Sequence, residues 1–211
     1  MPDFSLLPMI LLAALVASAS PGPATIAIAT TAAEHGRRPA LALASGILCG
    51  SFTWSIAAAC GLAAIMVTHG WLVEAIRYAG AGYLAWLAWK SASAAWRNDA
   101  AFADSSVTPA SLRTFWVRGL LLHLTNPKAI FFFGALYSIA LSPGQSSATL
   151  VMIVMAVGLQ SAAVFLGYAV LFSKAGFRRG YARAARGIRA TCAVLFGGFA
   201  YKLLTLRLTS A

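Results

Sequence analysis

The chain has very few charged residues for its length. Of its 211 residues, 10% are charged and 60% are hydrophobic, and the mean hydropathy is +0.79. A soluble domain of ordinary composition carries about 25% charged residues. This deficit excludes an ordinary water-soluble core and indicates that lipid surrounds most of the chain. We therefore predict an integral membrane protein.

Acidic residues are scarcer still. Five Asp and Glu stand against 16 Lys and Arg, which gives a formal net charge of +11. On a soluble protein this surplus would suggest a nucleic-acid partner. Here the aromatic residues lie inside apolar runs and leave no stacking platform for bases, so we expect no nucleic-acid binding. A surplus of basic residues is typical of the cytoplasmic side of a membrane protein.

Patterns for metal binding and catalysis are also missing. The cysteines have no CxxC spacing and the histidines are scattered; these residues are Cys49, Cys60, Cys192, His35, His69 and His123. Structural zinc sites and redox motifs need clustered ligands or paired thiols. We therefore expect no metal site, no cofactor and no enzymatic activity.

What the chain does contain is long apolar stretches. A transmembrane helix needs about 20 mostly apolar residues, and six windows qualify. We predict an all-α protein with six transmembrane helices at 4–32, 39–67, 71–91, 114–141, 147–173 and 188–208. The first window resembles a signal peptide, but Met1 to Asp3 carry no positive charge, so we expect this helix to be retained.

The distribution of basic residues predicts the orientation. With six spans, the first, third and fifth connections hold twelve of the sixteen Lys and Arg, and the opposite side holds three. This bias places those connections in the cytoplasm and both termini outside. The run 174–189 has no acidic residue and is expected to contact anionic lipid headgroups. A simple topological role for this run is the alternative.

The polar stretch 92–113 divides the chain into two halves, 1–91 and 114–211, within one membrane domain. Each half has three predicted spans, and the first span of each contains a proline break, SPGP at 20–23 and TNPK at 125–128. An odd number of spans per half inverts one half relative to the other. Inverted repeats with a broken helix in each half are typical of secondary transporters. A packed proline kink is the alternative for either break alone.

Lys128 stands inside the fourth predicted span, beside Asn126 and close to His123. A charge near the bilayer centre costs at least about 2.5 kcal/mol and indicates a functional pathway. A lysine that snorkels to the interface is the alternative. Gly46 and Gly50 form a GxxxG pattern, for which helix packing is the expected role.

Four segments resemble the LysE/RhtB family of amino-acid exporters, which are bacterial inner-membrane efflux proteins. These segments are SPGPA at 20–24, GRRPALALASGILCG at 36–50, IRYAGAGYLAWLAWK at 76–90 and RGLLLHLTNPKAIFFF at 118–133. The resemblance implies secondary transport of amino acids or small derivatives, driven by the proton motive force or an ion gradient. The chain departs from the family at Ala24, where Asp or Asn is frequent, and in the ALYSIALSP segment, where a Pro-Gln-Phe-like element is usual.

We predict that the substrate binds at the two breaks. The predicted substrate-binding residues are Ser20, Pro21, Gly22, Pro23, Ala24, Asn126, Pro127 and Lys128, and the predicted coupling or pathway residues are Glu34, His123 and Gln160. Lys128 is expected to bind the substrate carboxylate, and free backbone carbonyls near Ser20 and Pro21, together with Asn126, are expected to receive the ammonium group. No carboxylate lies deep in a predicted span, which favours a neutral or zwitterionic amino acid. A proton is the first candidate for the coupling ion. A metal or cation exporter is the alternative function, and a homo-oligomer is left open.

Overall fold

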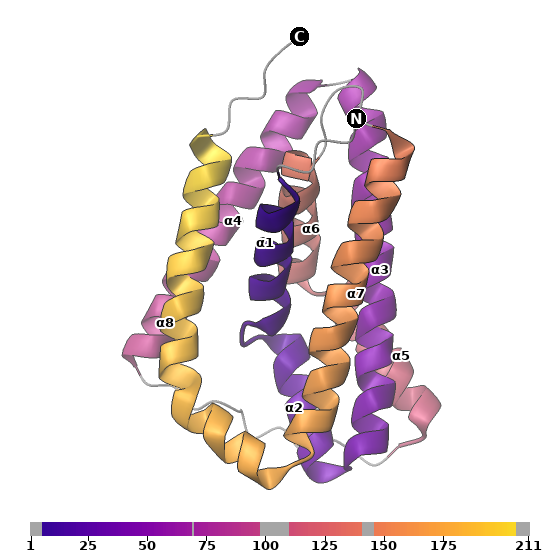
Figure 1. Ribbon diagram of the computed structural model, residues 1–211, viewed down its shortest axis with the longest axis vertical. Coiled ribbons are helices and arrows are strands. Elements are labelled where there is room, and N and C mark those ends of the chain that lie inside the picture. The colour runs from indigo at the N-terminus through magenta and orange to yellow at the C-terminus, as the bar shows by residue number, and fades with distance from the viewer. Residues whose placement is uncertain (1–5, 69, 98–109, 141–145, 206–211) are drawn as a thin grey trace.

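The computed structural model describes residues 6–68, 70–97, 110–140 and 146–205 (Figure 1). The described residues form eight helices and no strand. In chain order the helices are α1 (Leu7–Ala19), α2 (Pro23–Glu34), α3 (Arg37–Thr68), α4 (Gly70–Trp96), α5 (Leu112–Leu124), α6 (Pro127–Ala140), α7 (Ser147–Phe172) and α8 (Ala175–Thr205). The prediction of an all-α protein is confirmed.

Two pairs of helices are bent at short breaks. α1 and α2 meet at 49°, and α5 and α6 meet at 57°. Three further helices, α3, α7 and α8, are long and apolar enough to cross a membrane, and each bent pair also qualifies if it counts as one span. The described helices thus supply up to five spans by length and composition. α4 does not qualify on these criteria, so the sixth span stays a prediction.

The helices run along the long axis of the molecule (Figure 1). The start of α1 and the end of α8 lie at one end of the bundle. The turns from α2 to α3 and from α7 to α8 lie at the other end, with the end of α4 and the start of α5. The helix ends that flank the three connections with most of the basic residues therefore lie at a single end of the molecule.

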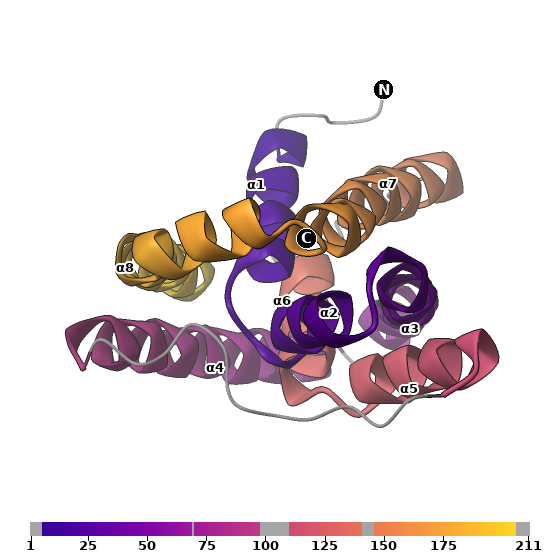
Figure 2. The ribbon, with the colours of Figure 1, turned by 90° about the horizontal axis from the view of Figure 1, so that it is seen from below.

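The helix that contains the last predicted span, 188–208, begins before that span. The basic run 174–189 was expected to be a connection, but α8 already begins at Ala175. Its first turns lie across the lower end of the bundle (Figure 2). Tyr181 and Ala185 are buried, and the ring of Phe177 lies 5.2 Å from that of Phe172. These small and aromatic residues give the run a packed face, and arginine is compatible with a helix.

Glycines bring α3 and α5 into close contact. A Cβ atom on Gly46 would lie 2.0 Å from the backbone oxygen of Trp116, and one on Gly119 would lie 2.1 Å from that of Leu43. At a third glycine of this interface, Gly50, an added Cβ would lie 2.9 Å from the Cβ atom of His123. The packing role expected for the GxxxG pattern is therefore confirmed, and its partner is α5.

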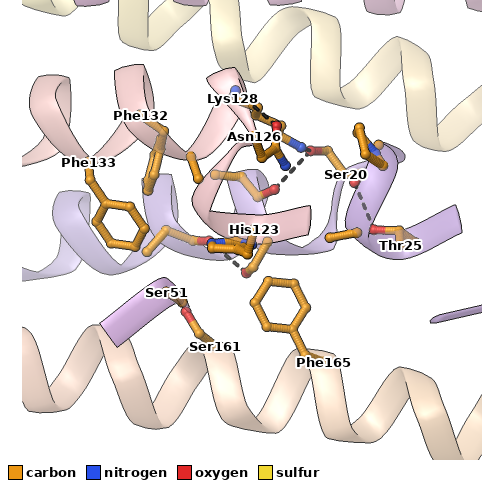
Figure 3. A pocket seen from close by; sticks show the side chains of 17 residues that line it. Ser20, Thr25, Ser51, His123, Asn126, Lys128, Phe132, Phe133, Ser161 and Phe165 are labelled. Carbon is orange, nitrogen blue, oxygen red and sulfur yellow. Dashed lines mark hydrogen bonds between the residues drawn. The ribbon is translucent and has the colours of Figure 1, made fainter. Parts of the chain in front are cut away.

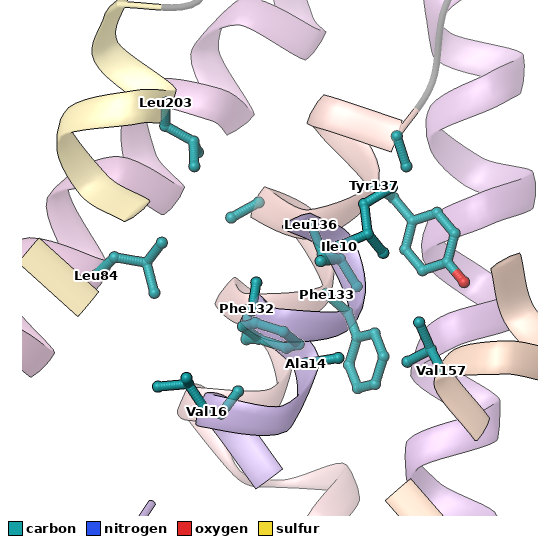
Figure 4. Packing of buried hydrophobic residues seen from close by; sticks show 14 of the residues in the cluster. Ile10, Ala14, Val16, Leu84, Phe132, Phe133, Leu136, Tyr137, Val157 and Leu203 are labelled. Carbon is teal, nitrogen blue, oxygen red and sulfur yellow. The ribbon is translucent and has the colours of Figure 1, made fainter. Parts of the chain in front are cut away.

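α1 lies in the interior, in contact with α6, α7 and α8. Aromatic side chains of α6, among them Phe132, Phe133 and Tyr137, pack there against Ile10 of α1 (Figure 4). Many large apolar side chains instead face outward, as expected where lipid is the solvent; they include Trp71, Trp89, Trp96, Val151, Leu159, Val194 and Tyr201. The predicted linker at 92–113 falls largely on residues 98–109, which lie outside the described residues.

Candidate functional site

The first break is a direct result of two prolines. Pro21 has no N–H to donate to the carbonyl of Ala17, four residues earlier in the helix. The hydroxyl of Ser20 donates to that carbonyl instead, at 3.1 Å. The carbonyl of Ser20 in turn accepts from the hydroxyl of Thr25 at 3.2 Å. Gly22 between the two helices is fully extended, with φ −176° and ψ −177°.

α7 satisfies the carbonyl freed by the second proline. Pro23 cannot donate to Ala19, and the Tyr168 hydroxyl donates to the Ala19 carbonyl at 2.9 Å. Eight residues earlier on both helices, the side-chain amide of Gln160 donates to the carbonyl of Leu11 at 3.0 Å. The carbonyls of Ala17 and Ala19 thus already accept hydrogen bonds from the protein, instead of standing open for a substrate ammonium group.

The second break is capped by Asn126. Pro127 cannot donate to the carbonyl of His123, and the backbone N–H of Asn126 takes its place at 3.2 Å. The side-chain oxygen of Asn126 accepts from the backbone N–H of Lys128 at 3.0 Å. This cap starts α6 in a new direction and fixes where the Lys128 side chain leaves the helix.

The two breaks face one another across a cavity of about 40 Å³ (Figure 3). A cavity of this volume has room for a few water molecules. Its lining residues come from α1, α2, α3, α5, α6 and α7 and the two breaks; they are Ala14, Ala17, Ser18, Ser20, Gly22, Pro23, Ala24, Thr25, Ser51, His123, Asn126, Lys128, Ala129, Phe132, Phe133, Ser161 and Phe165. Of these described lining residues, Lys128 alone is a basic residue, and none is Asp or Glu. The cavity therefore has a positive charge at one place, neutral polar groups at a few others, and apolar side chains between them.

Lys128 joins the two broken helices. Its half-buried side chain crosses from α6, and Nζ donates a hydrogen bond to Oγ of Ser20 at the first break. Nζ also lies 5.7 Å from the ring centre of Phe196 on α8, which adds a cation–π contact. The virtual Cβ of Gly22 lies 3.5 Å from Nζ, in ordinary van der Waals contact. The ammonium group is thus held inside the bundle and does not snorkel to the interface.

His123 is 6% exposed, and neither ring nitrogen has a hydrogen-bond partner among the described residues. The absence of a Cβ on Gly50 of α3 leaves room for the histidine, and the ring lies 5.9 Å from that of Phe165 on α7 in an edge-on arrangement. A buried polar group without a partner costs about 1–3 kcal/mol. Its two nitrogens are therefore available to a bound group.

The structure brings six of the eight predicted substrate-binding residues to one cavity. Pro21 and Pro127 do not line it and act through the backbone directions that they impose. Of the predicted pathway residues, His123 lines the cavity, and Gln160 ties α7 to α1 nearby. Glu34 is exposed at the end of α2, about 15 Å along the helix from Ala24. Roles in substrate binding and coupling stay predictions for all of them.

Sequence reasoning missed the lining residues contributed by the long helices α3 and α7. These are Ser51, Ser161 and Phe165, all buried, and the phenyl rings of α6 complete the wall. Ser51 follows Gly50 of the GxxxG pattern and Ser161 follows Gln160, which are weak signals at best. Serine and phenylalanine are ordinary residues in membrane helices, so only packing distinguishes these copies. The described residues contain no group of three His, Cys, Asp or Glu side chains that could hold a metal ion.

A multi-pass helical bundle with two broken helices facing a polar cavity is the architecture of a discontinuous-helix transport protein. Comparison with known sequences identifies the family: the LysE type translocator family matches residues 15–207, and the chain belongs to it. Members of this family are transporters, not enzymes.

Several named relatives match most of the chain. It is 33% identical over 194 residues to the threonine efflux protein of Salmonella typhimurium, covering 92% of this chain and 94% of that protein. It is 32% identical to the threonine efflux protein of Escherichia coli K12 with the same coverage. It is 28% identical over 191 residues to the leucine efflux protein of Klebsiella pneumoniae, covering 89% of each. No solved structure gives a significant match.

Proposed function

We propose that this protein exports amino acids across the bacterial inner membrane by alternating access to the cavity between its two helix breaks. The observation that carries the proposal is the Lys128 ammonium group, held inside the bundle against Ser20. A cation held inside a membrane bundle without a carboxylate partner among the described lining residues is suited to bind an anionic group. The family match and the efflux relatives support the same function.

The substrate in this proposal is a neutral, zwitterionic amino acid. Lys128 binds its carboxylate, and the N–H groups at the start of α2 and α6 add partial positive charge at the breaks. The described lining residues offer no carboxylate to a cationic side chain, so lysine and arginine would face repulsion from Lys128. The same repulsion argues against a metal cation as the cargo.

The proposed topology has six spans in two inverted halves, with both termini outside. α4 would be the remaining span. Exposed Trp71 and Trp89 lie near its two ends, about 27 Å apart along the helix, which matches aromatic belts at both interfaces. The α1–α2 and α5–α6 pairs run in opposite directions along the bundle, which supports the inversion of the halves (Figure 1).

Coupling to the proton motive force is part of the proposal. Glu34 and His123 are the nearest titratable candidates along the cytoplasmic path and at the cavity. Addition of a protonophore to loaded cells should stop export, whereas export that persists after the gradient collapses would remove this part of the proposal and leave the substrate site untouched.

The decisive experiment is export from cells loaded with dipeptides, which release amino acids internally. Cells that express the protein should accumulate a neutral amino acid outside, and Lys128→Met should abolish this accumulation at an equal level of membrane-inserted protein. The matched control is Lys202→Met, which removes an exposed lysine near the end of α8. Full export by Lys128→Met would overturn the site, and absence of export by the unmodified protein for every amino acid would overturn the function.

A further inference from the structure

The cavity has two polar ends. Figure 3 shows Lys128, Ser20 and Asn126 grouped at one end, with His123 set apart from them near Ser51 and Ser161. Phe132, Phe133 and Phe165 line the walls. The proposed function binds the substrate only at the end that holds Lys128, so the His123 end has no role in substrate binding yet.

The His123 end is built to meet a bound polar group. His123 is 6% exposed and both of its ring nitrogens lack a partner among the described residues. Ser51 and Ser161 are also buried, at 3% and 4% exposed, and line the same cavity from α3 and α7. Three polar side chains from three helices thus converge on a space that the protein itself does not fill.

The ring is also held in place. Gly50 leaves no side chain between α3 and the Cβ atom of His123, and Phe165 packs its ring edge-on at 5.9 Å. A group fixed in this way cannot turn away to find another partner. Its unpaired nitrogens would therefore discriminate between ligands that can and cannot hydrogen-bond with them.

The chemistry of imidazole indicates which group fits. A neutral imidazole has one N–H donor and one acceptor nitrogen. A hydroxyl both donates and accepts, as do the hydroxyls of Ser51 and Ser161. An ammonium group only donates, and a hydrocarbon side chain does neither. A hydroxyl is thus the substrate group that matches this end of the cavity.

We propose that His123, together with Ser51 and Ser161, binds the side-chain hydroxyl of the transported amino acid and selects hydroxylated amino acids over apolar ones of the same shape. The inference rests on the proposed function, because Lys128 must hold the carboxylate for the side chain to reach the other end. It gives His123 a role in substrate selection that the proposed function does not include.

Threonine and valine provide the test, because they differ only by a hydroxyl in place of a methyl group. A site built to hydrogen-bond a hydroxyl rejects the analogue that lacks it. We expect the unmodified protein to export threonine at least about tenfold faster than valine from equally loaded cells, since an unpaired buried polar group costs about that factor or more.

Two variants of similar length separate polarity from packing. His123→Met removes both nitrogens and should bring the threonine-to-valine ratio close to one, mainly through loss of threonine export. His123→Gln keeps a donor and an acceptor and should keep a preference for threonine. Valine export measured in the same cells reports folding and insertion of each variant.

Four outcomes would contradict the assignment of His123 or the proposed function. A ratio that is unchanged in His123→Met, or an equal fall in threonine and valine export in both variants, would overturn the assignment and indicate a packing or ammonium-binding role. Equal export of both amino acids by the unmodified protein would also overturn it while leaving the proposed function intact. If the unmodified protein exports neither threonine nor valine nor any other amino acid, that result would refute the proposed function instead.

Discussion

The Nζ atom of Lys128 donates a hydrogen bond to the Oγ atom of Ser20, although 108 positions separate the two residues in the chain. Each residue stands at the break of a different bent helix pair, and each break exists because proline removed a backbone donor. Hydrogen bonds between a charged donor and a neutral acceptor are stronger than neutral ones. This bond therefore makes the two breaks one structural unit around the cavity.

Replacement of Ser20 should weaken transport strongly. Ser20→Ala removes the partner of Lys128 and also the donor to the Ala17 carbonyl. A lost bond of this kind costs about 1–3 kcal/mol, so export should fall about tenfold. The matched control is Ser18→Ala. Ser18 also lines the cavity, but its hydroxyl donates to carbonyls of its own helix, at 2.7 Å for Ala14. Equal export by the two variants would contradict the prediction.

Loss of the Tyr168 hydroxyl should destabilise the first break. In Tyr168→Phe the carbonyl of Ala19 keeps neither its helical donor nor its side-chain donor. We expect a loss of about 1–2 kcal/mol in the free energy of unfolding, which corresponds to a fall in melting temperature of about 2–4 °C for each kcal/mol. Thermal unfolding in detergent measures the shift. Tyr201→Phe removes an exposed hydroxyl from α8 and should leave the melting temperature unchanged; a matching fall there would refute the explanation.

A methyl group at Gly46 should separate α3 from α5. The added Cβ would lie 2.0 Å from the backbone oxygen of Trp116, which cannot rotate away. We expect Gly46→Ala to lower stability by about 1–3 kcal/mol, the usual range for overpacking. It should also lower export, because His123 is carried on α5. Gly167→Ala is the control, since no atom lies within 4 Å of its added Cβ. The yield of folded protein and the melting temperature in detergent test both variants, and equal stability would sink the prediction.

The two ends of the bundle should differ in access to a membrane-impermeant thiol reagent. In a variant without Cys49, Cys60 and Cys192, a cysteine at exposed Arg183 should react only after the membrane is permeabilised. A cysteine at exposed Ser147, the first residue of α7, should react in intact spheroplasts. The reverse pattern would invert the proposed topology without changing the fold.

Much of the fold could be predicted from local sequence. The apolar length of 147–173 matches α7, Ser147–Phe172, almost to the residue. The breaks fall at Pro21, Pro23 and Pro127 because a missing N–H interrupts a helix in any environment. The start of α8 was missed because basic residues were taken to mark a connection, whereas charge reports the side of the membrane and not the end of a helix.

The composition of the site was less accessible. Lys128 is conspicuous in sequence because a charge in an apolar run is rare. Three other lining residues, Ser51, Ser161 and Phe165, are of ordinary type and lie far in sequence from either break. Close contacts at glycines, such as that of Gly50 with His123, decide which helices meet at the cavity.

The sequence by itself determined that this chain crosses a membrane, that its basic connections gather at one end, and that two of its spans break at proline, since apolar length, charge and a missing backbone donor act locally. Only the tertiary structure decided what fills each break. Packing brings the Tyr168 hydroxyl to the Ala19 carbonyl and the Lys128 ammonium group to Ser20. It also places His123 in the cavity wall, with neither ring nitrogen bonded to a partner among the described residues. These partners lie far apart in the chain, so no local rule could have paired them.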